Sequence, residues 1–132
     1  MSGARTRLGL RKFRALHPGS GIALIAPASP FVRDDFDRGV AEVRRLGFVP
    51  VYDDAVFARE DGIVAGSAEL RASAIRTAWR REDVDALLAV RGGYGSVELL
   101  PRLDAAECRA TPKAVIGYSD ITSLHAWLNG HV

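Results

Sequence analysis

The 132-residue sequence has a single cysteine, Cys108, so an internal disulfide is impossible and a reducing compartment is favoured. It lacks the run of ~20 apolar residues that spans a bilayer, and its N-terminus lacks the apolar core of a secretory signal. Hydrophobic residues make up 48% and charged residues 26% of the chain, which excludes a fibre or a disordered polypeptide. We therefore expect a compact cytoplasmic protein.

Acidic residues are absent from the first fourteen positions, which carry five basic ones: Arg5, Arg7, Arg11, Lys12 and Arg14. The remainder has thirteen basic and sixteen acidic residues, a net charge of −3, so the pI near 9.0 reflects this segment. We interpret residues 1–20 as a basic, solvated N-terminal extension. Contact with RNA or an anionic surface, or a short transit sequence, is the alternative, but we predict no nucleic-acid partner and no membrane association.

Nucleotide-binding and metal-binding patterns are also missing. The first turn, Pro27-Ala28-Ser29-Pro30, has no glycine fingerprint, and no Walker-type motif occurs. The three histidines, His17, His125 and His131, are too scattered for any familiar metal-ligand spacing. We therefore predict neither a metal nor a cofactor.

Short apolar runs alternate with segments of helical periodicity. The expected strands are 21–26, 48–52, 85–90 and 114–117, and the expected helices are 31–46, 67–81, 105–110 and 121–129. We also expect a short helix after residue 95 that carries Val97, Leu99 and Leu100. Ser67 is the expected N-cap of helix 67–81, whose inward side carries Leu70, Ala74, Ile75, Ala78 and Trp79. Cys108 falls inside an expected helix, so we expect a packed thiol there.

Strands that are apolar on both faces predict an α/β fold, a Rossmann-like or flavodoxin-like parallel sheet of about four or five strands with helices on both faces. Pro50 favours a sheet-edge position for the second strand. We assign residues 21–132 to this domain.

In such a sheet, ligands bind outside the carboxyl ends of the strands. Three segments rich in small residues reach that edge, namely 26–29, 91–95 and 117–120. We therefore expect a crevice lined largely by backbone.

Ser119 is the strongest candidate nucleophile, because it stands between an apolar strand and a helix with Gly117 before it, as in a nucleophile elbow. The backbone N–H of Asp120 would face the space of a developing oxyanion. The second glycine of the usual pattern is replaced by Ile121, so the match is incomplete. The alternative is that Ser119 only caps the helix.

The segment Arg91-Gly92-Gly93-Tyr94-Gly95 has three glycines in four positions, which lets a loop approach a ligand and expose backbone donors. It is compatible with a phosphate cradle, an oxyanion donor or a tight turn.

A serine nucleophile needs a base within hydrogen-bond reach, and the sequence offers none. His17 lies at the opposite edge of the sheet, and His125 is rotated by about 240° and raised by roughly 9 Å from Ser119 on one helix. His131 is farther still. Either Ser119 is a cap or its partner comes from another part of the protein; the chain stops just after the helix-end signal Asn129-Gly130, which favours the second.

Three motifs together resemble the L,D-carboxypeptidase family of serine peptidases, which includes murein tetrapeptide carboxypeptidases and microcin C immunity proteins. They are Ile25-Ala26-Pro27-Ala28-Ser29-Pro30, Arg91-Gly92-Gly93-Tyr94-Gly95 and Ile116-Gly117-Tyr118-Ser119-Asp120-Ile121-Thr122. Each is weak alone, but the ordered set is specific. The resemblance covers roughly residues 20 to 130, the N-terminal domain of the family.

The resemblance implies that Ser119 is the nucleophile of a Ser-Glu-His triad and that the backbone of Gly93 and Asp120 forms the oxyanion hole. We also expect three residues to contact substrate: Gly92, Tyr94 and Ser29. The implied reaction is hydrolysis of the amide between an L-centre and a terminal D-amino acid, in cell-wall recycling or a related peptide conjugate. The family uses no cofactor and forms homodimers.

The triad Glu and His belong to a C-terminal domain of the family that this sequence lacks, so we expect the isolated chain to be inactive. The alternative is a non-catalytic α/β module that binds a peptide or an anionic small molecule.

Overall fold

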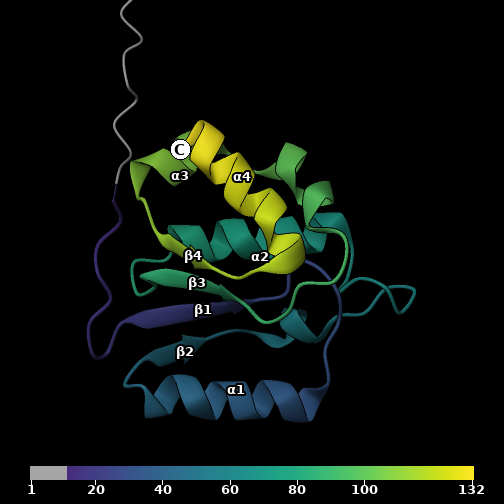
Figure 1. The fold of residues 1–132 in the computed structure, drawn as a ribbon, viewed down its shortest axis with the longest axis horizontal. Helices are drawn as coiled ribbons and strands as arrows, with labels where there is room; N and C mark the ends of the chain where they lie inside the picture. Colours follow the sequence, from purple (N-terminus) through teal and green to yellow (C-terminus); the bar gives the residue numbers. More distant parts are fainter. Residues whose placement is uncertain (1–11) are drawn as a thin grey trace, which may run out of the picture.

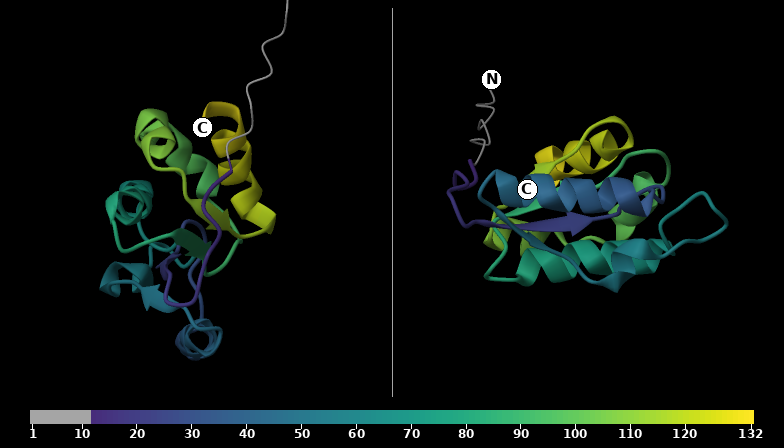
Figure 2. Two further views of the ribbon diagram at one scale, coloured as in Figure 1. Left: turned by 90° about the vertical axis from the view of Figure 1, so that its left-hand side faces the viewer. Right: turned by 90° about the horizontal axis from the view of Figure 1, so that it is seen from below.

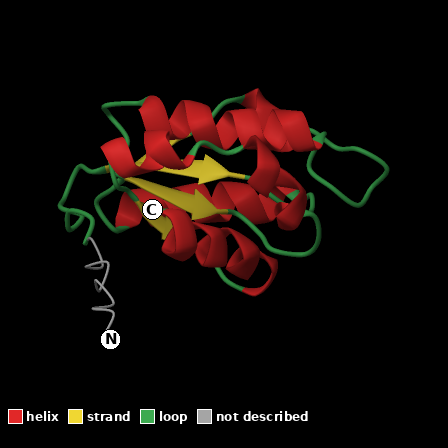
Figure 3. Cartoon of the chain, turned by 90° about the horizontal axis from the view of Figure 1, so that it is seen from above, coloured by secondary structure: helices red, strands yellow, loops and turns green. Residues whose placement is uncertain are grey.

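The computed structural model describes residues 12–132 and contains one four-stranded parallel sheet. Its strands are β1 (Gly21–Ile25), β2 (Val49–Val51), β3 (Ala86–Ala89) and β4 (Ala114–Ile116), in the order β2-β1-β3-β4 (Figure 1). All neighbouring pairs are parallel, and the arrows in Figure 3 point the same way. The predicted α/β class is confirmed, and β2 with its proline is an edge strand. Three of the basic residues, Arg5, Arg7 and Arg11, lie outside the described residues.

Helices cover both faces of this sheet (Figures 1 and 2). The α-helices are α1 (Arg33–Arg45), α2 (Ala68–Arg80), α3 (Ala105–Ala110) and α4 (Thr122–His131). Three 3₁₀ helices complete the secondary structure of residues 12–132: η1 (Asp54–Phe57), η2 (Ser96–Arg102) and η3 (Ser119–Ile121). Helix α1 packs on one face, whereas α2, α3 and α4 pack on the other.

The alternation of side chains along β1 explains the two layers of the core. Ala23 and Ile25 join the cluster under α2 and α4, while Ile22 and Leu24 join the cluster under α1. Every residue of β1 is buried. The continuous apolar runs of the sequence therefore reflect a sheet covered on both sides.

The strand order shows where along the carboxyl edge of the sheet a ligand site is expected. The chain runs from β1 outward to β2 and then returns to β3 on the other side of β1, so the order reverses between β1 and β3. Loops 26–30 and 91–95 follow these two strands, and loop 117–121 follows β4. All three leave carboxyl ends of parallel strands, where ligands of α/β sheets bind.

Several local features differ from the sequence predictions. Leu70, predicted to face inward, is 37% exposed, and the neighbouring Arg71 is buried instead. Residues 96–102 form a 3₁₀ helix on which Val97 is exposed, and α4 continues through Gly130 to His131. None of the helices in residues 12–132 has both the length and the apolar character needed to cross a membrane.

Candidate active site at the carboxyl edge of the sheet

Ser119 lies at the turn between β4 and α4, where it is the first residue of η3 and is exposed. Its φ is +60°, in the left-handed region that residues with a Cβ rarely adopt. Among the described residues, only Asp61 shares this feature outside glycine. Such strain persists only where the surroundings hold it, and it is frequent at functional sites. The predicted position of Ser119 in a tight strand-to-helix turn is therefore observed.

Gly92 lies against the backbone of this turn. A Cβ built on Gly92 would stand 3.3 Å from the Ser119 Cβ and from the Tyr118 carbonyl oxygen, and 3.4 Å from the Asp120 nitrogen. Most real Cβ atoms keep a greater distance than this, so the missing side chain lets the β3 loop approach the β4 loop closely.

Gly93 faces the loop after β1. Its φ is +110°, and a Cβ at this position would lie 2.3 Å from the Ser29 Oγ. The Ser29 hydroxyl accepts a hydrogen bond from the Tyr94 N–H (3.0 Å), and the Ser29 N–H donates to the Gly92 carbonyl (3.2 Å). Ser29 thus joins loop 91–95 to loop 26–30 through two hydrogen bonds. Tyr94 is 56% exposed.

The Asp120 side chain is held by the start of η2. Its carboxylate accepts a hydrogen bond from the Ser96 N–H (2.9 Å), and its carbonyl accepts one from the Ser96 hydroxyl (2.6 Å). The Ser123 hydroxyl also donates to this carbonyl (3.2 Å). Asp120 therefore joins the β4 loop to the β3 loop through contacts that leave its own N–H unused.

The N–H groups of Gly93 and Asp120 are among the backbone donors at this edge that have no protein acceptor in residues 12–132. Unused N–H groups on loops that meet at a serine are what an oxyanion hole requires.

Sequence reasoning missed Ser96 and Arg71. Ser96 has no exposed surface, and Arg71 is 3% exposed, with its guanidinium bonded to backbone carbonyls of three loops. The position of Arg71 was detectable, because it precedes the buried Ile75 by one helical turn. The role of Ser96 had no signal in the sequence.

No histidine in the described chain supplies the base. The His125 Nε2 lies 3.1 Å from the Val115 carbonyl oxygen, and the His131 Nδ1 lies 2.8 Å from the Trp127 carbonyl oxygen. His17 precedes β1 and so lies at the opposite edge of the sheet. In residues 12–132, no group of three His, Cys, Asp or Glu side chains is arranged to hold a metal ion.

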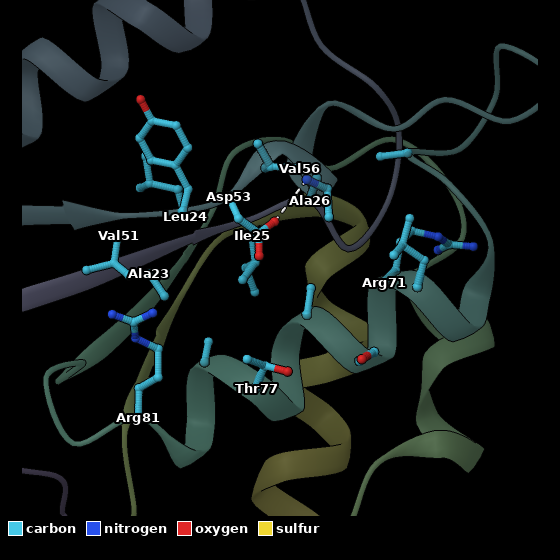
Figure 4. A pocket seen from close by; sticks show the side chains of 17 residues that line it. Ala23, Leu24, Ile25, Ala26, Val51, Asp53, Val56, Arg71, Thr77 and Arg81 are labelled. Atoms are coloured by element: carbon cyan, nitrogen blue, oxygen red, sulfur yellow. Dashed lines mark hydrogen bonds between the residues drawn. The ribbon is translucent and has the colours of Figure 1, made fainter.

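A separate cavity of about 210 Å³ lies between the β1–β2 edge of the sheet and α2 (Figure 4). Its polar lining includes Asp53, Thr77 and Arg81, and most of the other lining residues are apolar. Figure 4 shows Arg71 projecting from α2 at one end. Ser119 is not part of its lining. The candidate site is therefore the junction of the three loops rather than this cavity.

Serine hydrolases typically combine three features: a parallel α/β sheet, a strained serine between a strand and a helix, and nearby backbone N–H groups without a protein acceptor. This chain has all three. Residues 22–132 match the LD-carboxypeptidase N-terminal domain, and the chain belongs to this family. The resemblance noted in the three motifs is thereby confirmed.

Individual relatives agree with this assignment. Murein tetrapeptide carboxypeptidase of Pseudomonas aeruginosa is 34% identical over 111 residues, which cover 83% of this chain and 36% of that protein. Microcin C7 self-immunity protein MccF of Escherichia coli is 35% identical over 101 residues, 76% of this chain and 29% of that protein. A structure of an MccF variant in complex with adenosine monophosphate superposes with a TM-score of 0.85 at 28% identity, covering 90% of this chain and 36% of that one.

The chain spans about a third of the length of the curated relatives that it matches. The shared part is the one that carries Ser119 and the three loops.

Proposed function

We propose that this chain is the nucleophile-bearing part of a serine-type carboxypeptidase that hydrolyses an L,D-amide bond in murein tetrapeptides or in a related peptide conjugate. The observation that carries the proposal is the exposed, left-handed Ser119, which adjoins Asp120 in the chain and contacts Gly92 of the loop that carries Gly93; the N–H groups of Asp120 and Gly93 have no protein acceptor. Family membership and relatives with murein tetrapeptide carboxypeptidase names support the reaction class.

In the proposed reaction the Ser119 Oγ attacks the carbonyl carbon of the scissile amide while a base takes its proton. The carbonyl oxygen becomes an oxyanion, which accepts hydrogen bonds from the Gly93 and Asp120 N–H groups. Collapse of this intermediate expels the amine of the terminal D-amino acid, to which the base returns the proton. Water then attacks the acyl-enzyme in the same way and frees Ser119.

The base and the residue that orients it come from outside these 132 residues in this proposal. The resemblance implies a histidine and a glutamate on a C-terminal domain, and the shared third of the relatives' length leaves room for one. Removal of triad members leaves only about 10³–10⁴-fold catalysis over water in well-studied cases. Residues 1–132 alone are therefore expected to show no useful turnover.

Three further statements complete the proposal. Gly92, Tyr94 and Ser29 contact the peptide substrate, the complete enzyme is a homodimer, and it acts in the cytoplasm.

The test uses a fluorophosphonate probe, which labels activated serines, on a protein that includes the region downstream of residue 132. We expect labelling of the unsubstituted protein and none of Ser119→Ala. Ser73→Ala is the matched control, because Ser73 is exposed on α2 and should label normally. The same proteins are assayed for release of D-alanine from a murein tetrapeptide.

Labelling that persists in Ser119→Ala overturns the proposal and favours a binding module. Robust release of D-alanine by residues 1–132 alone would contradict the requirement for an external base.

A further inference from the structure

We propose that Arg71 is a positioning residue. Through hydrogen bonds to backbone carbonyls, it fixes the geometry of loop 91–95, which carries the oxyanion-hole donor Gly93. This inference rests on the proposed function, because it concerns the donor assigned to Gly93. The observation is a buried guanidinium that contacts backbone from three separate loops.

The contacts of Arg71 are directional. The Nε donates to the Gly66 carbonyl (2.9 Å), and the Nη1 donates both to the Pro27 carbonyl (2.8 Å) and to the Gly95 carbonyl (2.9 Å). The Nη2 donates to the Glu98 carboxylate (2.7 Å). A planar guanidinium with five N–H donors can satisfy these acceptors together, whereas a lysine ammonium cannot.

Two of these carbonyls lie beside the candidate site. Pro27 is two residues before Ser29, and Gly95 is two residues after Gly93. The Tyr94 N–H to Ser29 Oγ bond joins the same two loops on the other side. Ser29 therefore holds loop 91–95 at the Gly92 carbonyl and at the Tyr94 N–H, and Arg71 holds it at the Gly95 carbonyl, so the Gly93 N–H lies between the first and the last of these points.

The approach of Arg71 to Gly95 is close. Gly95 has a φ of +107°, and a Cβ on it would stand 3.0 Å from the Arg71 Nη1. The lack of a side chain at Gly95 thus leaves room for the Arg71 guanidinium and also allows the positive φ of the turn.

Arg71 acts through the loops and not on the substrate. Its side chain is 1% exposed, so it has no surface for a ligand. Glu98, whose side chain is 40% exposed, balances the charge. A buried cation with four of its five N–H donors paired is expensive to replace, because its acceptor partners would be left unpaired.

The test is amide NMR on residues 1–132, which needs neither substrate nor turnover. Arg71→Met removes all donors at similar length, Arg71→Lys keeps the charge, and Glu98→Gln keeps the guanidinium. Val43→Ala is the control, because Val43 is a buried residue near the C-terminal end of α1, away from the three loops, and its truncation also destabilises the fold.

We expect Arg71→Met to shift the amide resonances of Gly93 and Tyr94 and to speed hydrogen exchange at Tyr94 by about tenfold, the effect of losing one net hydrogen bond. Arg71→Lys should move the same resonances part of the way. Glu98→Gln and Val43→Ala should leave them in place. If Arg71→Met does not fold, the test compares the shifts of the Gly93 and Tyr94 amide resonances in Arg71→Lys with those in Val43→Ala.

Unmoved Gly93 and Tyr94 resonances in a folded Arg71 variant would overturn the positioning role. Failure of the proposed peptidase activity would appear separately, as Ser119-independent probe labelling, and would leave the NMR result unaffected.

Discussion

The Ile121 side chain occupies the space in which a Cβ on Gly117 would lie, with the Ile121 Cγ2 only 2.8 Å from that position. Ile121 is completely buried in the core under α4. The elbow around Ser119 therefore uses one glycine, Gly117, and fills the place of the usual second glycine with a core side chain. The second glycine of the usual motif is not needed here, because the turn forms with Ile121 in its place and the Ile121 side chain packs in the core.

This contact predicts that Gly117→Ala destabilises the domain by about 1–3 kcal/mol through overpacking. Ile121→Leu, which removes the branch at Cβ, should reduce that cost in the double variant. Urea unfolding of the four proteins measures the coupling. Gly39→Ala is the matched control: Gly39 lies in α1 with nothing within 4 Å of its built Cβ, so this change should stabilise by about 0.5–1 kcal/mol. Strict additivity of the Gly117 and Ile121 changes would contradict the prediction.

The fold was predictable from local patterns, because each strand is apolar on both faces and each helix has a recognisable boundary. Ser67 illustrates this: it was predicted as an N-cap, and its hydroxyl accepts a hydrogen bond from the Leu70 N–H. The place of Ser119 in the elbow was predictable for the same reason, since it depends on its immediate neighbours.

The supports of the site were not predictable, because they join residues that are distant in sequence. The contacts of Arg71 with Pro27 and of Ser96 with Asp120 span 44 and 24 residues. Hydrophobicity also predicted the wrong side chain on α2. It placed Leu70 inward, whereas the hydrogen bonds of Arg71 make burial of the arginine favourable.

Cys108 provides a prediction about pH. Burial raises the pKa of its thiol from about 9 to about 11, so it is the packed thiol expected from the sequence. Between about pH 9 and 11 the unfolded chain releases this proton and the folded chain retains it, so the free energy of unfolding falls as pH rises. Below pH 9 the Cys108 thiol is protonated in both the folded and the unfolded chain, so its contribution to the free energy of unfolding does not change with pH.

The measurement is urea unfolding from pH 8 to 11 for the unsubstituted chain and for Cys108→Ala. Other groups titrate alike in both proteins, so the difference between the curves isolates the thiol. The unsubstituted chain should lose stability more steeply above pH 9. Parallel curves would contradict the assigned pKa.

The Ser96 hydroxyl provides a third prediction, because it is buried and lies 2.6 Å from the Asp120 carbonyl oxygen and 2.5 Å from the Ser123 Oγ. Ser96→Ala should destabilise by about 1 kcal/mol, the net value of a buried hydrogen bond. Ser96→Ala and Ser123→Ala should be non-additive, because the two hydroxyls share Asp120. Chemical denaturation measures both effects, and the exposed Ser73→Ala should change stability by less than about 0.5 kcal/mol. Additive losses would show that the two serines act independently.

The φ of +60° at Ser119 predicts an inversion in the usual ranking of glycine and alanine. A residue with a Cβ loses about 1–2 kcal/mol in the left-handed region, whereas the added freedom of glycine in the unfolded chain costs about 0.4–1 kcal/mol. Ser119→Gly should therefore be more stable than Ser119→Ala by about 0.5–1 kcal/mol in urea unfolding. At Ser73, inside α2, the order should reverse, because glycine is about 1 kcal/mol worse than alanine in a helix. The same order at both positions would mean that Ser119 carries no strain and that its turn is an ordinary helix start.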